Sequence, residues 1–398
     1  MTMAADKQDK VLNVPTLRFP EYSDKWLECE LQDIADLSKG AGISKDQLSE
    51  TGESCILYGE LYTKYKSEVI SNVVSKTNIE STNLVRSKAN DVIIPSSGET
   101  AIDISTARCV PYDNILLGGD LNIIRLKDQD GRFFSYQLNG VRKLDIAQIA
   151  QGVSVVHLYG ESLKRLKVRY PSKSEQEKIS SLLSVLDERI ETQNRIIEDL
   201  KQLRSALIEN MYSHMPTKCK VGDAIMQVSM RNRDNTYCTV LSVNNRRKFI
   251  EQSEQFEDRI VASDDTSNYK VVKRNDFAYN PARINVGSIA RLTTFEDGIV
   301  SPMYICFQAK QQILPEYLEY FFYTRYFHNE MLKRLEGSVR MCLSWDSLCN
   351  IPLTIPNIEQ QRVVSRRISI LTDKIIIEEK YKEYLMIQKH YLLKAMFI

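Results

Sequence analysis

Residues that could bind a methyl donor occur only as fragments of known motifs. Asn280-Pro281 follows the apolar run Phe277 to Tyr279, as in the Asn-Pro-Pro-aromatic loop with which amino-methyltransferases hold an exocyclic amine. Ala282 and Arg283 stand where that loop needs its second proline and its aromatic residue. Gly40-Ala41-Gly42 is a lone G-x-G without the further glycines of a cofactor loop. Neither fragment predicts an S-adenosylmethionine site.

Metal-dependent and nucleophilic sites are not indicated either. A magnesium-dependent nuclease needs clustered acidic residues, whereas the pairs Glu257-Asp258 and Asp264-Asp265 are better explained as exposed loops. The four histidines lie far apart in the sequence. The eight cysteines are scattered singly without a C-x-x-C pair, so neither a zinc site nor a disulfide framework is expected. We therefore expect no catalytic residue and no metal or cofactor bound by this chain.

Polar and basic loops offer a different chemistry. Reading DNA requires donors for phosphates and Arg, Asn, Gln, Ser or Lys side chains that reach base edges. The candidate DNA-binding residues of the first half are Lys39, Tyr58, Tyr62, Lys64, Ser96, Ser97 and Thr100. Those of the second half are Arg231, Arg233, Asn245, Arg246, Arg247, Asn280, Arg283 and Arg340. Each cluster alone fits an ordinary solvated surface, but their recurrence on loops of both halves favours DNA reading.

Length and composition set the limits of this interpretation. A chain of 398 residues favours two or three domains. With 43% hydrophobic and 26% charged residues the chain is expected to be globular. The net charge of +1 decides nothing about nucleic acid, because local clustering is what matters. There is no run of about 18 apolar residues, and the first ten residues are polar, so we expect a soluble, cytoplasmic protein.

The sequence contains an internal repeat. Pro171 and Pro356 lie 185 residues apart. The same offset superimposes Gly152 on Gly337, Leu158 on Leu343, Gln176 on Gln361, Leu186 on Leu371, Ile190 on Ile375, Leu207 on Leu392, and Asn90-Asp91 on Asn275-Asp276. A constant offset over so long a stretch indicates a duplication.

Each half combines a mixed region with a long helix. Short β-type runs such as Val92–Ile94 and Tyr304–Phe307 alternate with turn residues and predict a mixed α/β globule. A proline then opens each helix candidate, and Glu175 and Glu177 lie in the first turn, where negative charge suits the helix dipole. The helices are expected from Ser172 to Tyr212 and from Asn357 to Phe397.

Both helices carry apolar residues in the alternating four-three spacing of a coiled coil. The first seam contains Ile179, Leu183, Leu186, Ile190, Ile197, Leu200 and Leu207. The second contains Val364, Ile368, Leu371, Ile375, Leu385 and Leu392, and is interrupted by Glu378, Lys382 and Lys389. At ~1.5 Å per residue each helix would form a rod of roughly 60 Å. The alternative is that each helix packs only against its own globule, but the narrow stripe flanked by charges favours a single partner helix.

Val14–Tyr22 (VPTLRFPEY), followed by Trp26 and Leu31–Ala35 (LQDIA), resembles the opening of the specificity subunits of type I restriction-modification enzymes. The junction from Pro171 to Glu175–Ile179 (EQEKI) and its repeat from Pro356 to Glu359–Val363 (EQQRV) resemble the same family. The sequence departs from the pattern at Thr372–Ile375, where the second helix differs from the first after their shared leucine.

The resemblance implies an α/β (α+β) fold with two mixed α/β target-recognition globules. Two long helices would join them as an antiparallel coiled coil, with an internal pseudo-two-fold duplication. The implied segments are an N-terminal arm (1–24), a first recognition domain (25–170), a central helix (171–214), a second recognition domain (215–355) and a C-terminal helix (356–398). Each domain would read one part of a split double-stranded DNA target, and the helices would set the gap.

The resemblance also implies a division of labour with partner subunits. Two modification subunits would carry the S-adenosylmethionine chemistry that methylates adenine, and two restriction subunits would carry ATP- and magnesium-dependent translocation and cleavage. This chain would bind and position the duplex without catalysis, and no membrane is implied. Two alternatives remain. The first is a self-contained DNA-modifying enzyme, which needs extra catalytic domains. The second is a coiled-coil scaffold that does not act on nucleic acid, and it would be favoured if the affinity of the chain for DNA did not respond to salt.

Overall fold

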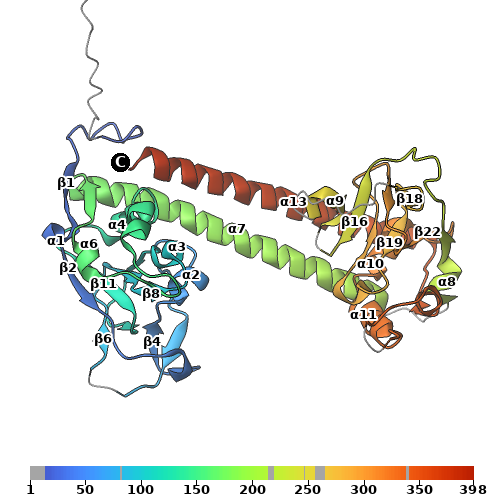
Figure 1. Cartoon of the computed structure of the whole chain (residues 1–398), viewed down its shortest axis with the longest axis horizontal. Helices are drawn as coiled ribbons and strands as arrows, with labels where there is room; N and C mark the ends of the chain where they lie inside the picture. Colours follow the sequence, from blue (N-terminus) through green and yellow to red (C-terminus); the bar gives the residue numbers. More distant parts are fainter. Residues whose placement is uncertain (1–13, 81–82, 214–218, 246, 256–264, 338–339) are drawn as a thin grey trace, which may run out of the picture. The chain divides into compact units, whose positions relative to one another are not determined.

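The computed structural model describes residues 14–80, 83–213, 219–245, 247–255, 265–337 and 340–398. The chain divides into two compact units (Figure 1). Unit 1 comprises Met1–Asn194 and Lys380–Ile398, and unit 2 comprises Arg195–Glu379. The candidate residues Arg246, Glu257, Asp258 and Asp264 lie outside the described residues.

Unit 1 is built from short strands and short helices. Its four-stranded antiparallel sheet has the order β2 (Ala35–Lys39), β11 (Leu121–Leu126), β7 (Asp91–Pro95) and β9 (Arg108–Val110). A five-stranded sheet has the order β3 (Leu48–Ser49), β5 (Ser75–Thr77), β4 (Glu53–Ile56), β10 (Leu116–Leu117) and β6 (Val85–Arg86). Two-stranded pairs are β1 (Leu27–Glu30) with β13 (Lys167–Tyr170) and β8 (Ser97–Gly98) with β12 (Val156–His157). The helices are α1 (Leu31–Ile34), η1 (Lys45–Gln47), α2 (Glu60–Thr63), α3 (Ala101–Ile104), α4 (Gly131–Asn139), α5 (Lys143–Ile149) and α6 (Gly160–Lys164).

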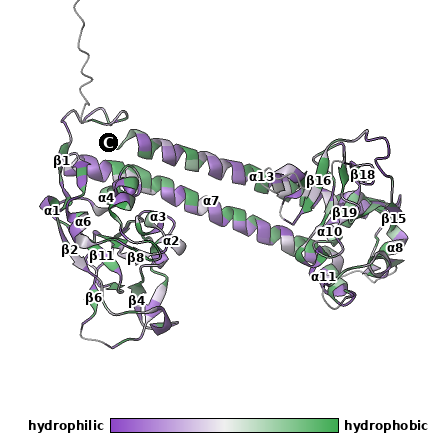
Figure 2. Ribbon diagram, viewed as in Figure 1, coloured by the Kyte–Doolittle hydropathy of each residue, from purple (hydrophilic) through white to green (hydrophobic). Residues whose placement is uncertain are grey.

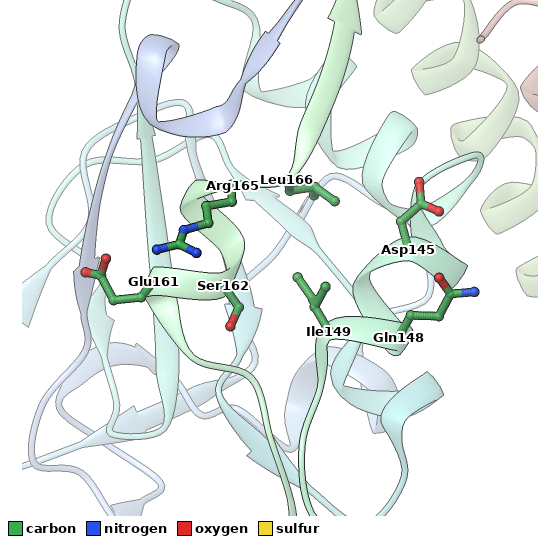
Figure 3. A pocket seen from close by; sticks show the side chains of 7 residues that line it. All are labelled: Asp145, Gln148, Ile149, Glu161, Ser162, Arg165 and Leu166. Atoms are coloured by element: carbon green, nitrogen blue, oxygen red, sulfur yellow. The ribbon is translucent and has the colours of Figure 1, made fainter.

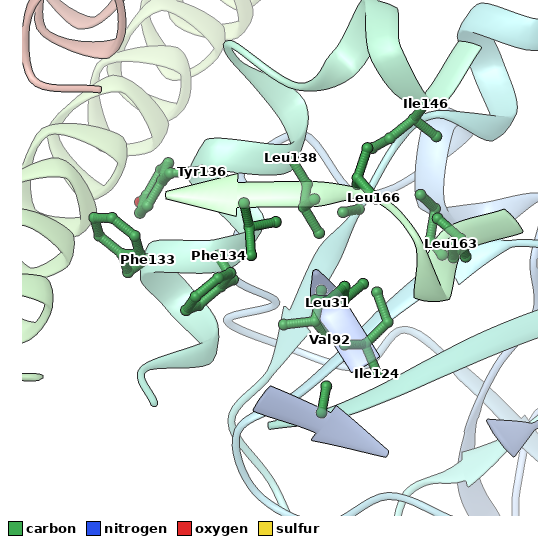
Figure 4. Packing of buried hydrophobic residues seen from close by; sticks show 14 of the residues in the cluster. Leu31, Val92, Ile124, Phe133, Phe134, Tyr136, Leu138, Ile146, Leu163 and Leu166 are labelled. Atoms are coloured by element: carbon green, nitrogen blue, oxygen red, sulfur yellow. The ribbon is translucent and has the colours of Figure 1, made fainter. Parts of the chain in front are cut away.

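The main core of unit 1 lies between the four-stranded sheet and the helices. Helix α4 begins at Asp130, whose carboxylate accepts hydrogen bonds from the backbone N–H groups of Arg132 and Phe133. This cap directs Phe133, Phe134 and Tyr136 into the core, as Figure 4 shows together with Val92 and Ile124 of the sheet. The same cluster includes the first turns of the long helix α7 and the last residues of the chain. The globular part of unit 1 is therefore packed directly on both long helices.

Unit 2 repeats this plan with its own elements. One sheet has the order β15 (Ile225–Val228), β22 (Ile305–Ala309), β19 (Phe277–Tyr279) and β20 (Ile289–Arg291), and the other has the order β17 (Lys248–Glu251), β16 (Val240–Asn244), β21 (Asp297–Val300) and β18 (Lys270–Lys273). Strand β14 (Cys219–Lys220) pairs with β23 (Pro352–Leu353). The helices are α8 (Val221–Ala224), α9 (Gln252–Gln255), η2 (Ile284–Val286), α10 (Pro315–Phe321), α11 (Arg325–Leu332) and α12 (Trp345–Cys349).

The long helices are α7 (Lys173–Ser213) and α13 (Ile358–Ala395). In unit 1 the start of α7 shares the core with the end of α13, since Leu183 and Met396 belong to one cluster. In unit 2 the Nζ of Lys201 on α7 lies 2.6 Å from the Oε1 of Glu379 on α13. The two helices therefore run antiparallel in both units. The predicted mixed α/β fold with two long antiparallel helices is confirmed.

The predicted seam residues lie on the covered sides of these helices. Hydrophobic and polar residues alternate along both helices in Figure 2. The buried members are Ile179, Leu183, Leu186, Ile197, Ile368, Ile375 and Leu385. The half-buried members are Ile190, Leu200, Leu207, Val364, Leu371 and Leu392. The charged interruptions Glu378, Lys382 and Lys389 are also half-buried, so polar side chains occupy part of the second seam.

The duplication is visible in the backbone of the two units. Gly152 and Gly337 both have positive φ, at 121° and 117°, a conformation that a residue with a Cβ atom rarely adopts. The two turns are closed by equivalent isolated bridges: Gln151 with His157, and Glu336 with Cys342. Asn90 and Asn275 likewise share a left-handed φ of 79° and 73°. The repeat therefore includes the strained turn positions as well as the helices.

Candidate nucleic-acid interface

Unit 2 contains a hollow of about 620 Å³, here called the unit-2 hollow. It is lined by Ser242, Val243, Asn244, Asn245, Gln252, Tyr269, Asn280, Ala282, Arg283, Val286, Ser288, Ser301, Met303, Tyr304 and Arg340. Four of the predicted DNA-binding residues come together here: Asn245, Asn280, Arg283 and Arg340. The described residues of the lining include two arginines and four side-chain amides, and none of them is a carboxylate. These residues are rich in hydrogen-bond donors that suit a phosphate or a base edge.

The floor of the unit-2 hollow is fixed by hydrogen bonds between neighbouring strands. The Ser288 hydroxyl donates to the Val243 carbonyl at 3.2 Å, and the Val243 N–H donates to the Tyr304 hydroxyl at 3.3 Å. The backbone N–H of Asn280 donates to the Ser288 carbonyl at 3.0 Å. Asn280, Ser288 and Tyr304 are all buried. Because these hydrogen bonds join residues of different strands and loops, the floor keeps its shape when a ligand approaches.

The rim is formed by the turn that follows β19. Oδ1 of Asn280 accepts the backbone N–H of Ala282 at 3.1 Å, which starts the turn. Gly287 ends it with a φ of 89°, where a side chain would be strained. Arg283 therefore lies on a short, shaped turn and is exposed, as are Asn245 and Arg340 across the hollow. Within the described part of the chain neither arginine forms an ion pair, so both guanidinium groups can bind a ligand.

The other candidates of unit 2 do not line this hollow. The guanidinium of Arg231 donates to the Asn268 carbonyl at 2.9 Å, and that of Arg247 lies 3.2 Å from Glu254. Arg233 is exposed. Arg246 lies outside the described residues. Of the described second-half candidates, four line the unit-2 hollow. The other three, Arg231, Arg233 and Arg247, are exposed elsewhere on unit 2.

The candidates of unit 1 are more dispersed. Lys64 is held by Glu60 at 2.7 Å and donates to the Ser75 hydroxyl at 2.9 Å, which ties it to its own globule. Thr100 caps α3 by accepting the backbone N–H of Asp103 at 3.1 Å. Ser96 and Ser97 are buried. These four positions therefore have structural partners or little exposure.

The two candidate tyrosines of unit 1 lie in α2 and just before it. Tyr58 and Tyr62 are half-buried, and burial raises the pKa of the Tyr62 hydroxyl. The Tyr62 hydroxyl stays protonated at neutral pH and can serve as a donor.

Lys39 belongs to a separate hollow of unit 1. This hollow of about 300 Å³ is lined by Leu37, Ser38, Lys39, Asn122, Tyr159, Gly160, Glu161 and Lys164. Tyr159 is 47% exposed, and Lys164 lies 2.5 Å from Glu161. Tyr159 and Lys164 were not predicted as site residues. Tyr159 precedes α6 and Lys164 is the last residue of α6, and both lie far from Lys39 in the sequence. Only the folded sheet brings them together.

A further hollow of about 470 Å³ lies between α5 and α6 (Figure 3). Asp145, Gln148 and Ile149 come from α5, and Glu161, Ser162 and Arg165 come from α6 and its end. Asp145 pairs with Arg142 at 3.1 Å. The carboxylates of Asp145 and Glu161 on its lining would repel the phosphates of DNA, so this hollow is a poor phosphate site.

Among the described residues, no group of three or more His, Cys, Asp or Glu side chains is arranged to hold a metal ion. No helix in the described ranges is long and apolar enough to cross a membrane.

Comparisons with known proteins point to one family. A family model described as the type I restriction modification DNA specificity domain matches residues 23–202. The type I restriction enzyme MjaVIII specificity subunit of Methanocaldococcus jannaschii is 21% identical over 95% of this chain and 92% of its own length. The crystal structure of a type I restriction-modification S subunit from M. genitalium shares the fold with a TM-score of 0.62, at 17% identity over 97% of this chain and 99% of that chain.

A second solved structure agrees in fold. It comes from a study of complex assembly and conformational transition of a type I restriction-modification system, and matches with a TM-score of 0.56 at 12% identity, over 94% of this chain and 97% of that chain. The resemblance inferred from the sequence motifs is confirmed by these independent comparisons. Residues 23–202 are a type I restriction-modification DNA specificity domain, and the chain as a whole resembles the specificity subunits of these systems.

Proposed function

We propose that this chain is the DNA-reading subunit of a type I restriction-modification complex. Its two recognition domains, at 25–170 and 215–355, each bind one part of a split double-stranded DNA target, and the long helices set the gap between the parts. The observation that carries this proposal is the duplicated backbone with divergent loops. Two equal scaffolds with different surface side chains suit the reading of two different short sequences.

The turn that contains the positive-φ glycine illustrates this divergence. In unit 1 the residues after Gly152 include Val153, which is 97% exposed, and Val155, which is 53% exposed. In unit 2 the equivalent turn after Gly337 carries the exposed Arg340. Position 155 of unit 1 thus presents a valine, whereas the equivalent position 340 of unit 2 presents a guanidinium. Apolar groups suit the thymine methyl, whereas arginine suits guanine or phosphate.

The catalytic roles belong to partner subunits in this proposal. Modification subunits would hold S-adenosylmethionine and methylate adenine, and restriction subunits would use ATP and Mg²⁺. A target adenine must leave the base stack to reach a methyltransferase pocket, so the subunit that reads the flanking bases need only hold and deform the duplex. Such a subunit requires no catalytic residue of its own.

Exposed apolar residues on the long helices support a partner interface. In unit 2, α13 exposes Val363, Ile370 and Ile377 at seven-residue intervals. In unit 1 the next two positions of the same spacing, Tyr384 and Tyr391, are 68% and 61% exposed. This stripe is distinct from the seam that faces α7. A second heptad stripe is suited to a helix from another chain.

Long-read methylation sequencing tests the proposal. DNA from a host that carries this chain and its modification subunit, without a restriction subunit, should show a split methyladenine motif with a fixed gap. Replacing residues 25–170 by the corresponding domain of a relative should change one half of the motif and leave the other half and the gap intact. A stable complex that methylates no motif would instead favour the scaffold alternative.

A further inference from the structure

The unit-2 hollow has more donors than its own structure uses. The Oδ1 of Asn280 accepts the backbone N–H of Ala282, and the one partner of its Nδ2 among the described residues is the Met303 sulfur, at 3.6 Å. A thioether sulfur is a weak acceptor. The amide N–H groups of this buried side chain are therefore available to a better acceptor inside the hollow.

The rim adds guanidinium donors to this amide. Arg283 lies three residues after Asn280, and Arg340 lies on the turn that follows Gly337. Each guanidinium carries five N–H donors in a planar fork. Among the described lining residues there is no carboxylate to neutralise them. A ligand that meets these two guanidinium groups must therefore present adjacent acceptors to them.

Among the four bases, guanine is the one whose major-groove edge presents two adjacent acceptors, O6 and N7. Adenine and cytosine each place a donor amine on that edge, and a guanidinium has no acceptor for it. Building on the proposed function, we infer that the unit-2 hollow reads a guanine of the second half-site, with Arg283 donating to O6 and N7. Asn280 lies at the strand end that positions this arginine.

A phosphate offers acceptors too, so the test must separate a base from the backbone. The half-site methylated by the wild-type complex is first defined by sequencing. Duplexes are then made with 7-deazaguanine, which lacks the N7 acceptor, at each guanine of the second half-site in turn. The affinity of each duplex for the complex of this chain with its modification subunit is then measured. One such substitution should weaken binding about tenfold or more, because one of two hydrogen bonds is lost. Inosine at the same position, which keeps O6 and N7, should bind nearly as well as guanine.

Variants of Arg283 provide the second arm. Arg283→Ala should weaken cognate binding about ten- to a hundredfold and make one G·C position of the motif degenerate, with the first half-site unchanged. Arg283→Lys should lose the same discrimination, because lysine keeps the charge but lacks the fork. The matched control is Arg274→Ala in the same unit, whose arginine is exposed, pairs with Glu296 at 2.5 Å and does not line the hollow. This control should keep the full motif.

Three results would overturn the assignment. In the first, Arg283→Ala weakens all sequences alike with a shallower salt dependence, and Arg283→Lys restores binding, which identifies a phosphate contact. In the second, 7-deazaguanine is tolerated at every position. In the third, the second half-site contains no guanine. Absence of any methylated motif with the wild-type complex counts against the proposed function, whereas a clear motif with these results counts against the guanine assignment alone.

Discussion

The Nζ of Lys389 on α13 lies 2.6 Å from Oδ1 of Asp187 on α7 and 2.5 Å from Oε2 of Glu68 in the globular part of unit 1. The Tyr136 hydroxyl of α4 donates to the other Asp187 oxygen at 2.7 Å. The side chains of Lys389, Asp187 and Glu68 are only 15%, 10% and 11% exposed. One lysine in the helix seam thus binds the other helix and the globule at the same time.

The 185-residue repeat does not preserve this cluster. The positions equivalent to Lys389 and Asp187 are Arg204 and Thr372, and Phe321 stands in the place of Tyr136. The cluster therefore distinguishes the end of α13 that packs in unit 1 from the equivalent part of α7 in unit 2. Polar groups in a helix seam often specify pairing at some cost in stability.

Removing the lysine should destabilise unit 1 strongly. Lys389→Met keeps the side-chain length but leaves two carboxylates buried without their cation, which costs about 3–5 kcal/mol for a buried pair. The measurement is the free energy of unfolding from denaturant titration. Lys201→Met is the matched control, because its ion pair with Glu379 is 43% and 46% exposed and should contribute about 1 kcal/mol or less. Equal losses for the two variants would contradict a special role of the buried cluster.

The same cluster should make stability sensitive to alkaline pH. Burial lowers the pKa of Lys389, but the charges of Glu68 and Asp187 outweigh it and hold this pKa above its ordinary value. A lysine whose folded-state pKa is raised contributes its full stability below the unfolded pKa of about 10.4 and loses it as pH rises through the folded value. The gap in unfolding free energy between wild type and Lys389→Met should thus be constant from pH 7 to 9 and shrink above about pH 10.5. A gap that stays constant to pH 12 would show that the charge is not what stabilises the cluster.

Two equivalent glutamines should have equal effects in the two units. Gln176 is fully buried, accepts the Asp130 N–H at 3.0 Å and donates to the Pro171 carbonyl at 2.9 Å. Gln361 is fully buried and makes the same pair of bonds, to the Leu314 N–H at 2.7 Å and the Pro356 carbonyl at 2.9 Å.

Gln176→Leu and Gln361→Leu each leave a backbone donor and acceptor unsatisfied, at about 1–3 kcal/mol per group. Each variant should therefore lower the free energy of unfolding of its own unit by a similar amount, measured by hydrogen exchange of the two units. Gln202→Leu, on an exposed position of α7, should change little. A loss in one unit only would show that the duplication does not extend to these anchors.

These glutamines show what sequence can predict. A repeat with a constant offset identifies positions that the backbone uses twice, and the heptad spacing identifies which helix residues are covered. Both signals depend on local periodicity, which the fold preserves. Loop residues carry no such signal. Lys64 and Thr100 are as polar as Arg283, but Lys64 forms an ion pair with Glu60 and Thr100 caps α3.

The unit-2 hollow could be predicted only in part for the same reason. Asn245, Asn280, Arg283 and Arg340 were identified as separate basic or amide clusters, and nothing in their spacing shows that they share one hollow. Gln252 and Tyr304 were missed, since they reach it from α9 and from the turn before β22. The pairing of β16 with β21 and of β19 with β22 creates the site, and sequence patterns do not specify which strands become neighbours.

The exposed stripe on α13 should be needed for assembly and not for DNA contact. Ile370 is 59% exposed, so Ile370→Asp should leave folding nearly unchanged while placing a charge in an apolar helix interface. On the proposed function, this variant should lose co-purification with the modification subunit and lose methylation in the host, whereas the purified chain should keep its salt-dependent affinity for DNA, measured by fluorescence anisotropy. Ile370→Val is the matched control and should assemble like wild type. Normal co-purification of the aspartate variant would place the partner surface elsewhere on the chain, and a parallel loss of DNA affinity would mean that the stripe supports the fold.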